Sequence, residues 1–146
     1  MRAWCAICLL CALSAGGCDN SQYADRPVTS LRLATACDIQ EGCKAGDAAL
    51  SVHVQFDAPP RALKPFRVSV HAAGQQPVET VMVTFLMQGM DMGLNRYRML
   101  GDNLSGWRAD VTLPVCVSGR SDWIAEFDLV STGRHAVLRV PFVLQD

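Results

Sequence analysis

Sulfur side chains carry the most distinctive chemistry in this sequence. Three methionines, Met87, Met90 and Met92, lie within six residues in the segment LMQGMDMGLN. Met90 and Met92 are two positions apart, so in an extended loop their thioethers point to the same side. Thioether sulfur is a soft, uncharged ligand that selects Cu(I) over harder ions. The spacing therefore predicts a copper(I) site in the loop over residues 87–92.

Cys116, in the stretch LPVCVSG, is the candidate fourth ligand of this site. A thiolate binds Cu(I) more strongly than a further thioether does, provided that Cys116 lies near the methionine loop. The alternative is that the methionines have no metal, because methionine is also a flexible apolar side chain that fills gaps and contacts partners. We expect Met82 and Met99 only to pack, and for the three loop methionines both interpretations stay open.

The N-terminus has the layout of an export signal. Arg2 precedes an apolar run over residues 3–13, and the small residues Ser14-Ala15-Gly16-Gly17 follow. A charged start, a short apolar stretch and a small-residue exit are typical of a secretory signal peptide. The apolar run is shorter than the roughly 20 residues that a membrane-spanning helix needs. The sequence thus predicts a cleaved signal over residues 1–17.

Cys18 follows directly after this signal and resembles the cysteine of a bacterial lipobox, which is acylated through its thiol and becomes the first residue of the mature chain. The sequence departs from most lipoboxes in having Ala15 where they have leucine. The alternative is an ordinary signal peptide with a chance cysteine. The pair Asp19-Asn20 resembles the inner-membrane retention signal of enterobacterial lipoproteins. We therefore expect a lipid-anchored protein of the bacterial envelope, on the periplasmic side, with residues 18–30 as lipidated terminus and flexible tether.

Three further cysteines follow Cys18, namely Cys37, Cys43 and Cys116. Thiols in an exported chain are in an oxidising compartment and tend to form disulfides. Cys37 and Cys43 bracket a five-residue segment that contains Gly42, and we expect them to pair because of this proximity. Cys116 is then left over, either as a buried inert thiol or as a ligand.

The rest of the chain alternates apolar and polar residues with a period of two, which is typical of half-buried strands. About seven short strands with turn signals between them predict an all-β fold, an antiparallel β-sandwich of immunoglobulin-like topology over residues 31–146. Pro141 in the last strand favours an edge position. The segment 78–87 is apolar on both faces, as in a central strand. The expected inward-facing residues are Leu50, Val52, Val54, Phe56, Phe66, Val68, Val70, Trp107, Ala109, Val111, Leu113, Trp123, Ala125, Phe127, Leu129, Ala136, Leu138, Val140, Phe142 and Leu144.

Composition and motifs favour a binding protein over an enzyme. The chain has 146 residues and a formal net charge of -1, so nothing in its charge favours nucleic acid as a partner. After the expected signal peptide, the sequence lacks a glycine-rich phosphate loop and the HExxH, GxSxG and CxxC motifs; the CxxC spacings at Cys5–Cys8 and Cys8–Cys11 lie within that signal. The three histidines, His53, His71 and His135, fall on outward-facing strand positions. We expect no catalytic activity.

The stretch VTFLMQGMDMGLNRYRML, followed by GWRADVTLPVCVSGRSDWIAEFDL, resembles the YtkA-like/FixH-like group of periplasmic domains. Met90-Asp91-Met92-Gly93 matches the Met-x-Met segment of that group, and Gly106-Trp107 matches the start of its next strand. The resemblance covers residues 48–146 and implies an immunoglobulin-like sandwich, copper handling and cytochrome oxidase assembly, with a copper-handling or assembly protein as partner. It departs from FixH-type proteins in having a lipid anchor in place of a membrane helix, and the segment LPVCVSGRSDW is not general in the group. The alternative function is a structural or partner-binding envelope lipoprotein without metal, whose methionine loop is a hydrophobic contact surface.

Overall fold

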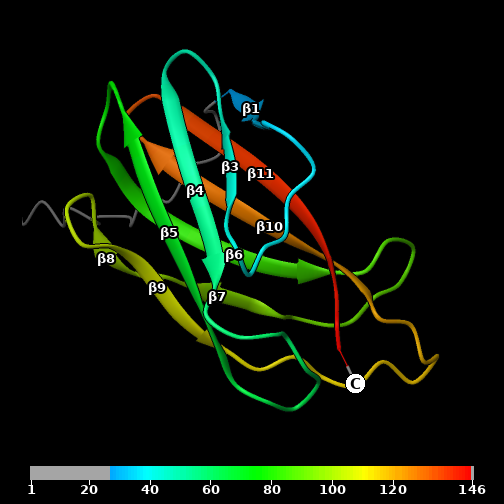
Figure 1. Ribbon diagram of the computed structural model, residues 1–146. Coiled ribbons are helices and arrows are strands. Elements are labelled where there is room, and N and C mark those ends of the chain that lie inside the picture. Colours follow the sequence, from blue (N-terminus) through cyan, green and yellow to red (C-terminus); the bar gives the residue numbers. More distant parts are fainter. Residues whose placement is uncertain (1–26, 146) are drawn as a thin grey trace, which may run out of the picture.

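A computed structural model describes residues 27–145 of the protein. The expected signal peptide (residues 1–17), the lipidation site Cys18 and most of the expected tether lie outside the described residues. The described part is all-β and contains eleven strands and no helix, so it offers no helix long and apolar enough to span a membrane. The strands form two sheets that face each other as a β-sandwich (Figure 1). The predicted fold class is confirmed at this level.

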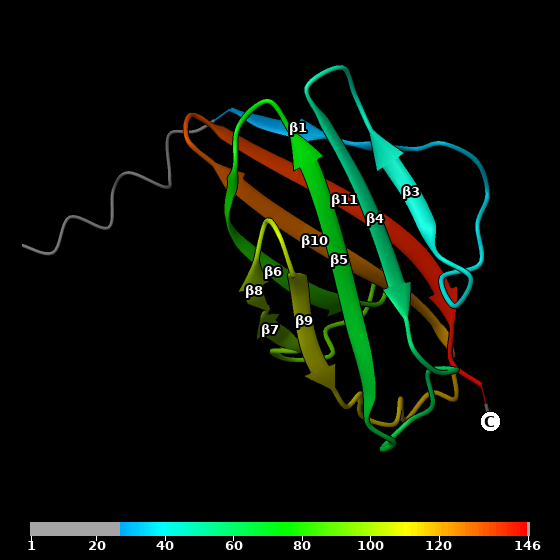
Figure 2. The ribbon, with the colours of Figure 1, turned by 60° about the vertical axis from the view of Figure 1, so that its left-hand side comes forward.

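Five strands form the first sheet, which we call sheet A. Their order is β1 (Val28–Ser30), β11 (Arg134–Val143), β10 (Asp122–Ser131), β6 (Val78–Leu86) and β7 (Arg96–Arg98). Sheet B has six strands, in the order β2 (Arg32–Leu33), β3 (Cys43–Gly46), β4 (Leu50–Phe56), β5 (Phe66–Gly74), β9 (Gly106–Val111) and β8 (Leu100–Asp102). Figure 2 shows β3, β4, β5 and β9 in front of the long strands of sheet A.

The core lies between the sheets and is formed by the inward-facing residues of each strand. Every second residue along β4, β10 and β11 is buried, which is the pattern of strands with one face against a core. Full burial of a valine, leucine or phenylalanine side chain stabilises the fold by about 1.5 to 3 kcal/mol. All the predicted inward-facing residues are buried except Ala109, which is half-buried near the free edge of β9.

The N-terminal part and the middle of the sandwich differ from the sequence expectation. The strands β1, β2 and β3 were not expected, because they are two to four residues long and polar or small in composition. β1 pairs in parallel with β11 and lies inside the expected tether, so the sheet starts before residue 31. The expected strand RYRML divides into β7 and β8, because the chain crosses from sheet A to sheet B at the buried Met99.

Pro141 lies in β11 where this strand has no neighbour on its outer side. The carbonyl of Val137 accepts a hydrogen bond from the Leu31 amide, so the odd-numbered residues of β11 direct their backbone groups away from β10. β1 covers only His135 to Val137. The missing amide proton of Pro141 therefore faces the uncovered edge, where it interrupts no strand pairing.

The disulfide between Cys37 and Cys43 is present, as predicted, and Cys116 is free and buried. Cys43 is fully buried in β3 and pairs with Val54 of β4, so the disulfide holds the loop 37–43 against the edge of sheet B.

We predict that replacing both Cys37 and Cys43 by alanine lowers the free energy of unfolding by about 2 kcal/mol, the chain-entropy contribution of so short a loop. Cooperative unfolding should persist, because the paired inner faces of the long strands are untouched. Urea denaturation followed by circular dichroism measures both quantities. Treating the parent with a reductant should reproduce the loss, and peptide mapping that finds Cys116 in a disulfide would contradict the assignment.

Candidate functional site

The register of β6 against β10 brings the methionine loop and the Cys116 segment to the same end of the sandwich. The two strands are antiparallel, and Leu86, the last residue of β6, pairs with Ile124 near the start of β10. The segment that follows β6 and the segment that precedes β10 therefore leave the sheet side by side, at the right of Figure 1.

A tight turn positions Met87 and Met90 opposite each other. The Met90 amide donates to the Met87 carbonyl at 3.2 Å, and the two residues form an isolated antiparallel bridge. Gly89 at the third position has a φ of 75°, a conformation that favours glycine and is required there by a type II turn. Side chains of residues paired in this way lie on the same face. The turn thus holds two thioethers as neighbours.

The remainder of the loop is fixed by side chains that bond to its backbone. Asp91 Oδ1 accepts from the Gly93 amide at 2.8 Å, and Asn95 Nδ2 donates to the Met92 carbonyl at 2.7 Å. Such local bonds are a common way to define a loop that has no strand partner. Met92 is half-buried and packs against the core, whereas Leu94 is 94% exposed.

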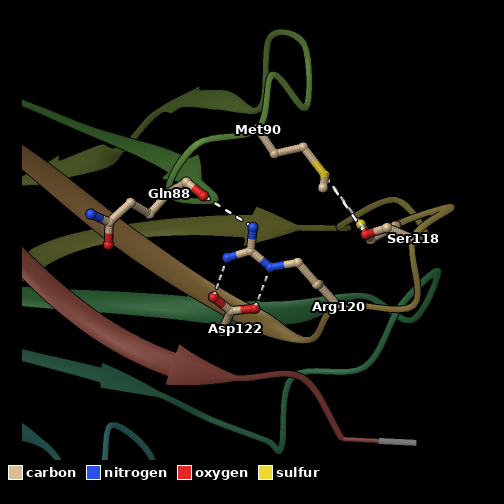
Figure 3. Close-up of polar contacts among 6 residues, drawn as sticks. Gln88, Met90, Ser118, Arg120 and Asp122 are labelled. Carbon is tan, nitrogen blue, oxygen red and sulfur yellow. Dashed lines mark hydrogen bonds and ion pairs between the residues drawn. The ribbon is translucent and has the colours of Figure 1, made fainter.

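The sulfurs of Met90 and Cys116 are in contact. The Cys116 thiol donates to Met90 Sδ at 3.4 Å, and the Ser118 hydroxyl lies 3.0 Å from Cys116 Sγ and 4.0 Å from Met90 Sδ. Figure 3 shows the Met90 side chain extending from its loop toward Ser118. The Gly119 amide donates to the Cys116 carbonyl at 3.0 Å, which closes a turn and brings Ser118 back over the thiol. These residues form what we call the sulfur site: Met87, Met90, Cys116 and Ser118.

Arg120 ties the two segments of the site together. Its Nη1 donates to the Gln88 carbonyl in the methionine turn at 3.0 Å, and its Nε donates to Asp122 Oδ1 at 2.9 Å (Figure 3). The ion pair with Asp122 raises the pKa of Arg120 and lowers that of the carboxyl. The guanidinium therefore bridges the start of β10 and the turn after β6 as a permanent cation.

The surroundings of Cys116 favour its thiolate. The Ser118 hydroxyl is the largest cause that lowers the pKa of the Cys116 thiol, and the Ser118 and Arg120 amides and the Arg120 charge act in the same direction against the effect of burial. Hydrogen bonds and positive charge favour the ionised form of a thiol. A thiol of this kind is a better soft ligand and nucleophile than an ordinary cysteine.

The structure brings three of the four predicted ligands together, Met87, Met90 and Cys116, whereas Met92 packs separately against the core. Met90 and Cys116 are brought into contact, and Met87 lies beside Met90 in the turn and is buried. Among the described residues, neither Met87 nor Met92 takes part in the hydrogen bonds of Cys116. His53 and His71 pair directly across β4 and β5 on the outer face of sheet B, away from the site. The described residues contain no cluster of three or more His, Cys, Asp or Glu that could hold a metal.

Ser118 and Arg120 were not among the residues predicted from the sequence. Their signal is weak, since they stand two and four positions after Cys116 in a turn segment. Cys116 also borders a pocket of about 320 Å³, which is lined in part by Arg61, Lys64 and Arg120. Cys116 is only 6% exposed, so it contributes little of its surface to this pocket.

Comparisons with known proteins add little to this geometry. No family model matches the sequence, and no curated protein matches it. Among solved structures, an engineered protein from a structural genomics consortium aligns over 64% of this chain with 15% sequence identity and a TM-score of 0.48. The aligned part is only 20% of that longer protein. So distant a likeness supports no inference about the function of this chain.

We predict that Ser118→Ala raises the pKa of the Cys116 thiol, because the variant loses the hydrogen bond that stabilises the thiolate most. The thiolate should then form at higher pH than in the parent. The measurement is the ultraviolet absorbance of the thiolate as a function of pH, taken as the difference from a protein that carries Cys116→Ala. Identical titration curves for the parent and Ser118→Ala would show that the hydroxyl does not act on the thiol.

Proposed function

We propose that this protein is a membrane-anchored periplasmic lipoprotein that binds one Cu(I) ion at the sulfur site, in copper handling or cytochrome oxidase assembly. The observation that carries the proposal is the contact between Met90 Sδ and Cys116 Sγ at 3.4 Å, from two segments distant in sequence. Soft sulfur ligands with no hard carboxylate among them select Cu(I).

The spacing of the two sulfurs is compatible with a shared metal ion. Two sulfur ligands at about 2.3 Å from one ion, the length of a zinc–thiolate bond, lie roughly 3.8 Å apart at the tetrahedral angle. The observed 3.4 Å differs from this by a few tenths of an ångström. Small rotations of the flexible Met90 side chain are enough to make up the difference.

Each residue of the site has a distinct part in the proposed binding. Cys116 supplies the anionic sulfur, and its lowered pKa reduces competition from the proton. Met90 and Met87 supply neutral thioethers from the turn, and Met92 supplies a third from the half-buried part of the loop. Arg120 positions the turn relative to Cys116 through the Gln88 carbonyl.

The strand order supports the immunoglobulin-like topology and, with it, the resemblance to YtkA-like/FixH-like domains. The order β4-β5-β9-β8 corresponds to strands A, B, E and D of an immunoglobulin domain, and β11-β10-β6-β7 corresponds to G, F, C and an added C′ strand. In this scheme the methionine loop is the connection between strands C and C′. The lipid anchor at Cys18 rests on the sequence alone.

A second candidate function is a partner-binding lipoprotein without metal. It is favoured by the apolar side chains exposed around the site, since Leu94 is 94% exposed, Val115 57% and Val117 fully so. Exposed apolar residues grouped in one area are typical of contact surfaces. In this case the methionine loop is a hydrophobic lip, and its sulfurs have no special part.

We predict that Cys18→Ser releases the protein from the membrane fraction. Acyl chains contribute about 0.8 kcal/mol per buried CH₂ group, so their loss removes the anchor. Osmotic shock followed by fractionation measures the distribution. Recovery of the parent in the soluble fraction, in the same proportion as the variant, would contradict lipidation.

We predict that the full chain, purified in non-ionic detergent, binds one Cu(I) ion. A titration in competition with a chromophoric chelator measures the affinity. Met90→Leu and Cys116→Ser should each weaken binding about tenfold or more, which corresponds to roughly 1.4 kcal/mol per ligand. Leucine has nearly the volume of methionine, so the packing should change little. Met82→Leu is the matched control, because Met82 lies in β6 outside the site, and it should bind as the parent does. Stoichiometric binding that survives in a Met90→Leu/Cys116→Ser double variant, or no binding by the parent, would favour the second function.

A further inference from the structure

Four arginines line one hollow on the side of the sandwich, away from the sulfur site. The hollow has a volume of about 640 Å³ and lies where the edge of sheet A, at β7, faces β8 and β9 of sheet B. The Tyr97 hydroxyl donates to the Thr112 carbonyl at 2.8 Å and joins the two sheets at this position. The residues that line the hollow include Arg67, Arg96, Tyr97, Arg98, Leu100 and Arg108.

Most of the positive charge in this hollow has no internal counterpart. Arg67 pairs with Asp110 at 2.8 Å, and both side chains are more than half exposed. Within the described part of the chain, Arg96, Arg98 and Arg108 have no carboxylate partner. The whole chain has a formal charge of -1, so this cluster is a local feature and not a result of a basic composition. Its charge is therefore available to an anionic group from outside the chain.

The same arginines stand on an open strand edge. The Asn95 carbonyl and the Met99 amide bond to β6, so Arg96 and Arg98, which alternate with them, direct their backbone amides and carbonyls away from β6. β7 is the last strand of sheet A, and these groups face the side where the sheet ends. An exposed edge of this kind can accept an added strand. Guanidinium groups and unpaired backbone groups thus occur on the same two residues, Arg96 and Arg98.

A second copy of this chain does not fit this edge. Edge-to-edge pairing of two β7 strands would bring Arg96 and Arg98 of one copy against the same residues of the other, and like charges in facing positions repel. An extended segment with carboxylates has the opposite property. Residues two apart in a strand lie about 6.8 Å apart on one face, so carboxylates at alternate positions match the spacing of Arg96 and Arg98.

We propose that β7 and the adjoining arginine hollow bind an extended acidic segment of a partner protein by strand addition. The backbone of the segment pairs with the free amides and carbonyls of Arg96 and Arg98. Alternate Glu or Asp side chains of the segment face these two guanidinium groups, and Arg108 lies beyond them across the hollow. The carboxylates give specificity for charge and spacing, and the backbone bonds give the extended conformation.

The test uses the full chain in non-ionic detergent and a peptide that alternates Glu and Thr. Fluorescence anisotropy of the labelled peptide should show saturable one-to-one binding, and Arg96→Gln/Arg98→Gln should weaken it about tenfold or more. The control Arg32→Gln/Lys44→Gln removes the same charge from the opposite edge of sheet B, where both side chains are exposed, and should change the affinity less than twofold. An isomer of the peptide with all Glu residues in one block should bind more weakly than the alternating one.

Backbone pairing has its own readout. Hydrogen exchange at the amides of Arg96 and Arg98 should slow when the peptide binds, and N-methylation of the peptide at alternate residues should abolish both this protection and the binding. The proposal would be overturned if Arg96→Gln/Arg98→Gln and Arg32→Gln/Lys44→Gln weakened binding equally, or if the alternating and block peptides bound with equal affinity. Either result would mean that the peptide binds by non-specific electrostatic attraction. Binding to vesicles of phosphatidylglycerol and phosphatidylcholine that depends on Arg96 and Arg98, with no peptide binding, would overturn it in favour of a membrane contact.

Discussion

The pairing of β6 with β10 is the constraint on which the rest of the structure depends. β10 is hydrogen bonded to β6 on one side and to β11 on the other, and its inner face is buried from Trp123 to Leu129. A shift of one residue in this register would turn that face toward solvent, so burial fixes the register. Once it is fixed, the turn after Leu86 and the segment before Asp122 must emerge together. The contact between Met90 and Cys116, which lies beyond the ends of these strands, is thus a consequence of the core packing along their inner faces.

The alternation of apolar and polar residues in the sequence predicted the strands whose inner faces form the core. It missed the short strands and the surface features that core packing does not fix. The inner faces of β4, β5, β10 and β11 could be assigned residue by residue, because strict period-two burial leaves a clear pattern. β3, with the sequence CKAG, has too few apolar residues to show such a pattern, although Cys43 and Ala45 are buried. The crossing at Met99 was hidden because Tyr97 and Met99 continue the alternation while the chain changes sheets. The four arginines of the hollow come from three separate strands, β5, β7 and β9, so only the pair Arg96 and Arg98 carries a local signal.

The sulfur site is built in loops whose conformation is fixed by polar contacts in addition to the packing of Met87 and Cys116 against the core. Gly89 permits the turn, Asp91 and Asn95 hold the next residues, and Arg120 joins the turn to the segment before β10. Rigid scaffolds commonly present binding residues on loops of this kind. Loop residues can move slightly at a low cost in free energy. This property suits the proposed Cu(I) ion, which accepts several ligand arrangements. Of these residues, Arg120 also contributes to the lowered pKa of the Cys116 thiol, after the larger effect of the Ser118 hydroxyl, so one residue acts on both the geometry and the reactivity of the thiol.

The two ends of the sandwich are unlike, and this gives the molecule a direction. β1 enters beside His135, near the turn between β10 and β11, whereas Met90 and Cys116 lie beyond the other end of β10. The stretch of β10 from Ile124 to Ser131 separates these ends by roughly 24 Å at about 3.4 Å per residue. If a surface held the chain by its N-terminal side, the end of the sandwich with the turn between β10 and β11 would lie nearest to that surface. The sulfur atoms would then stand at the outer tip, within reach of molecules that diffuse in the space beyond.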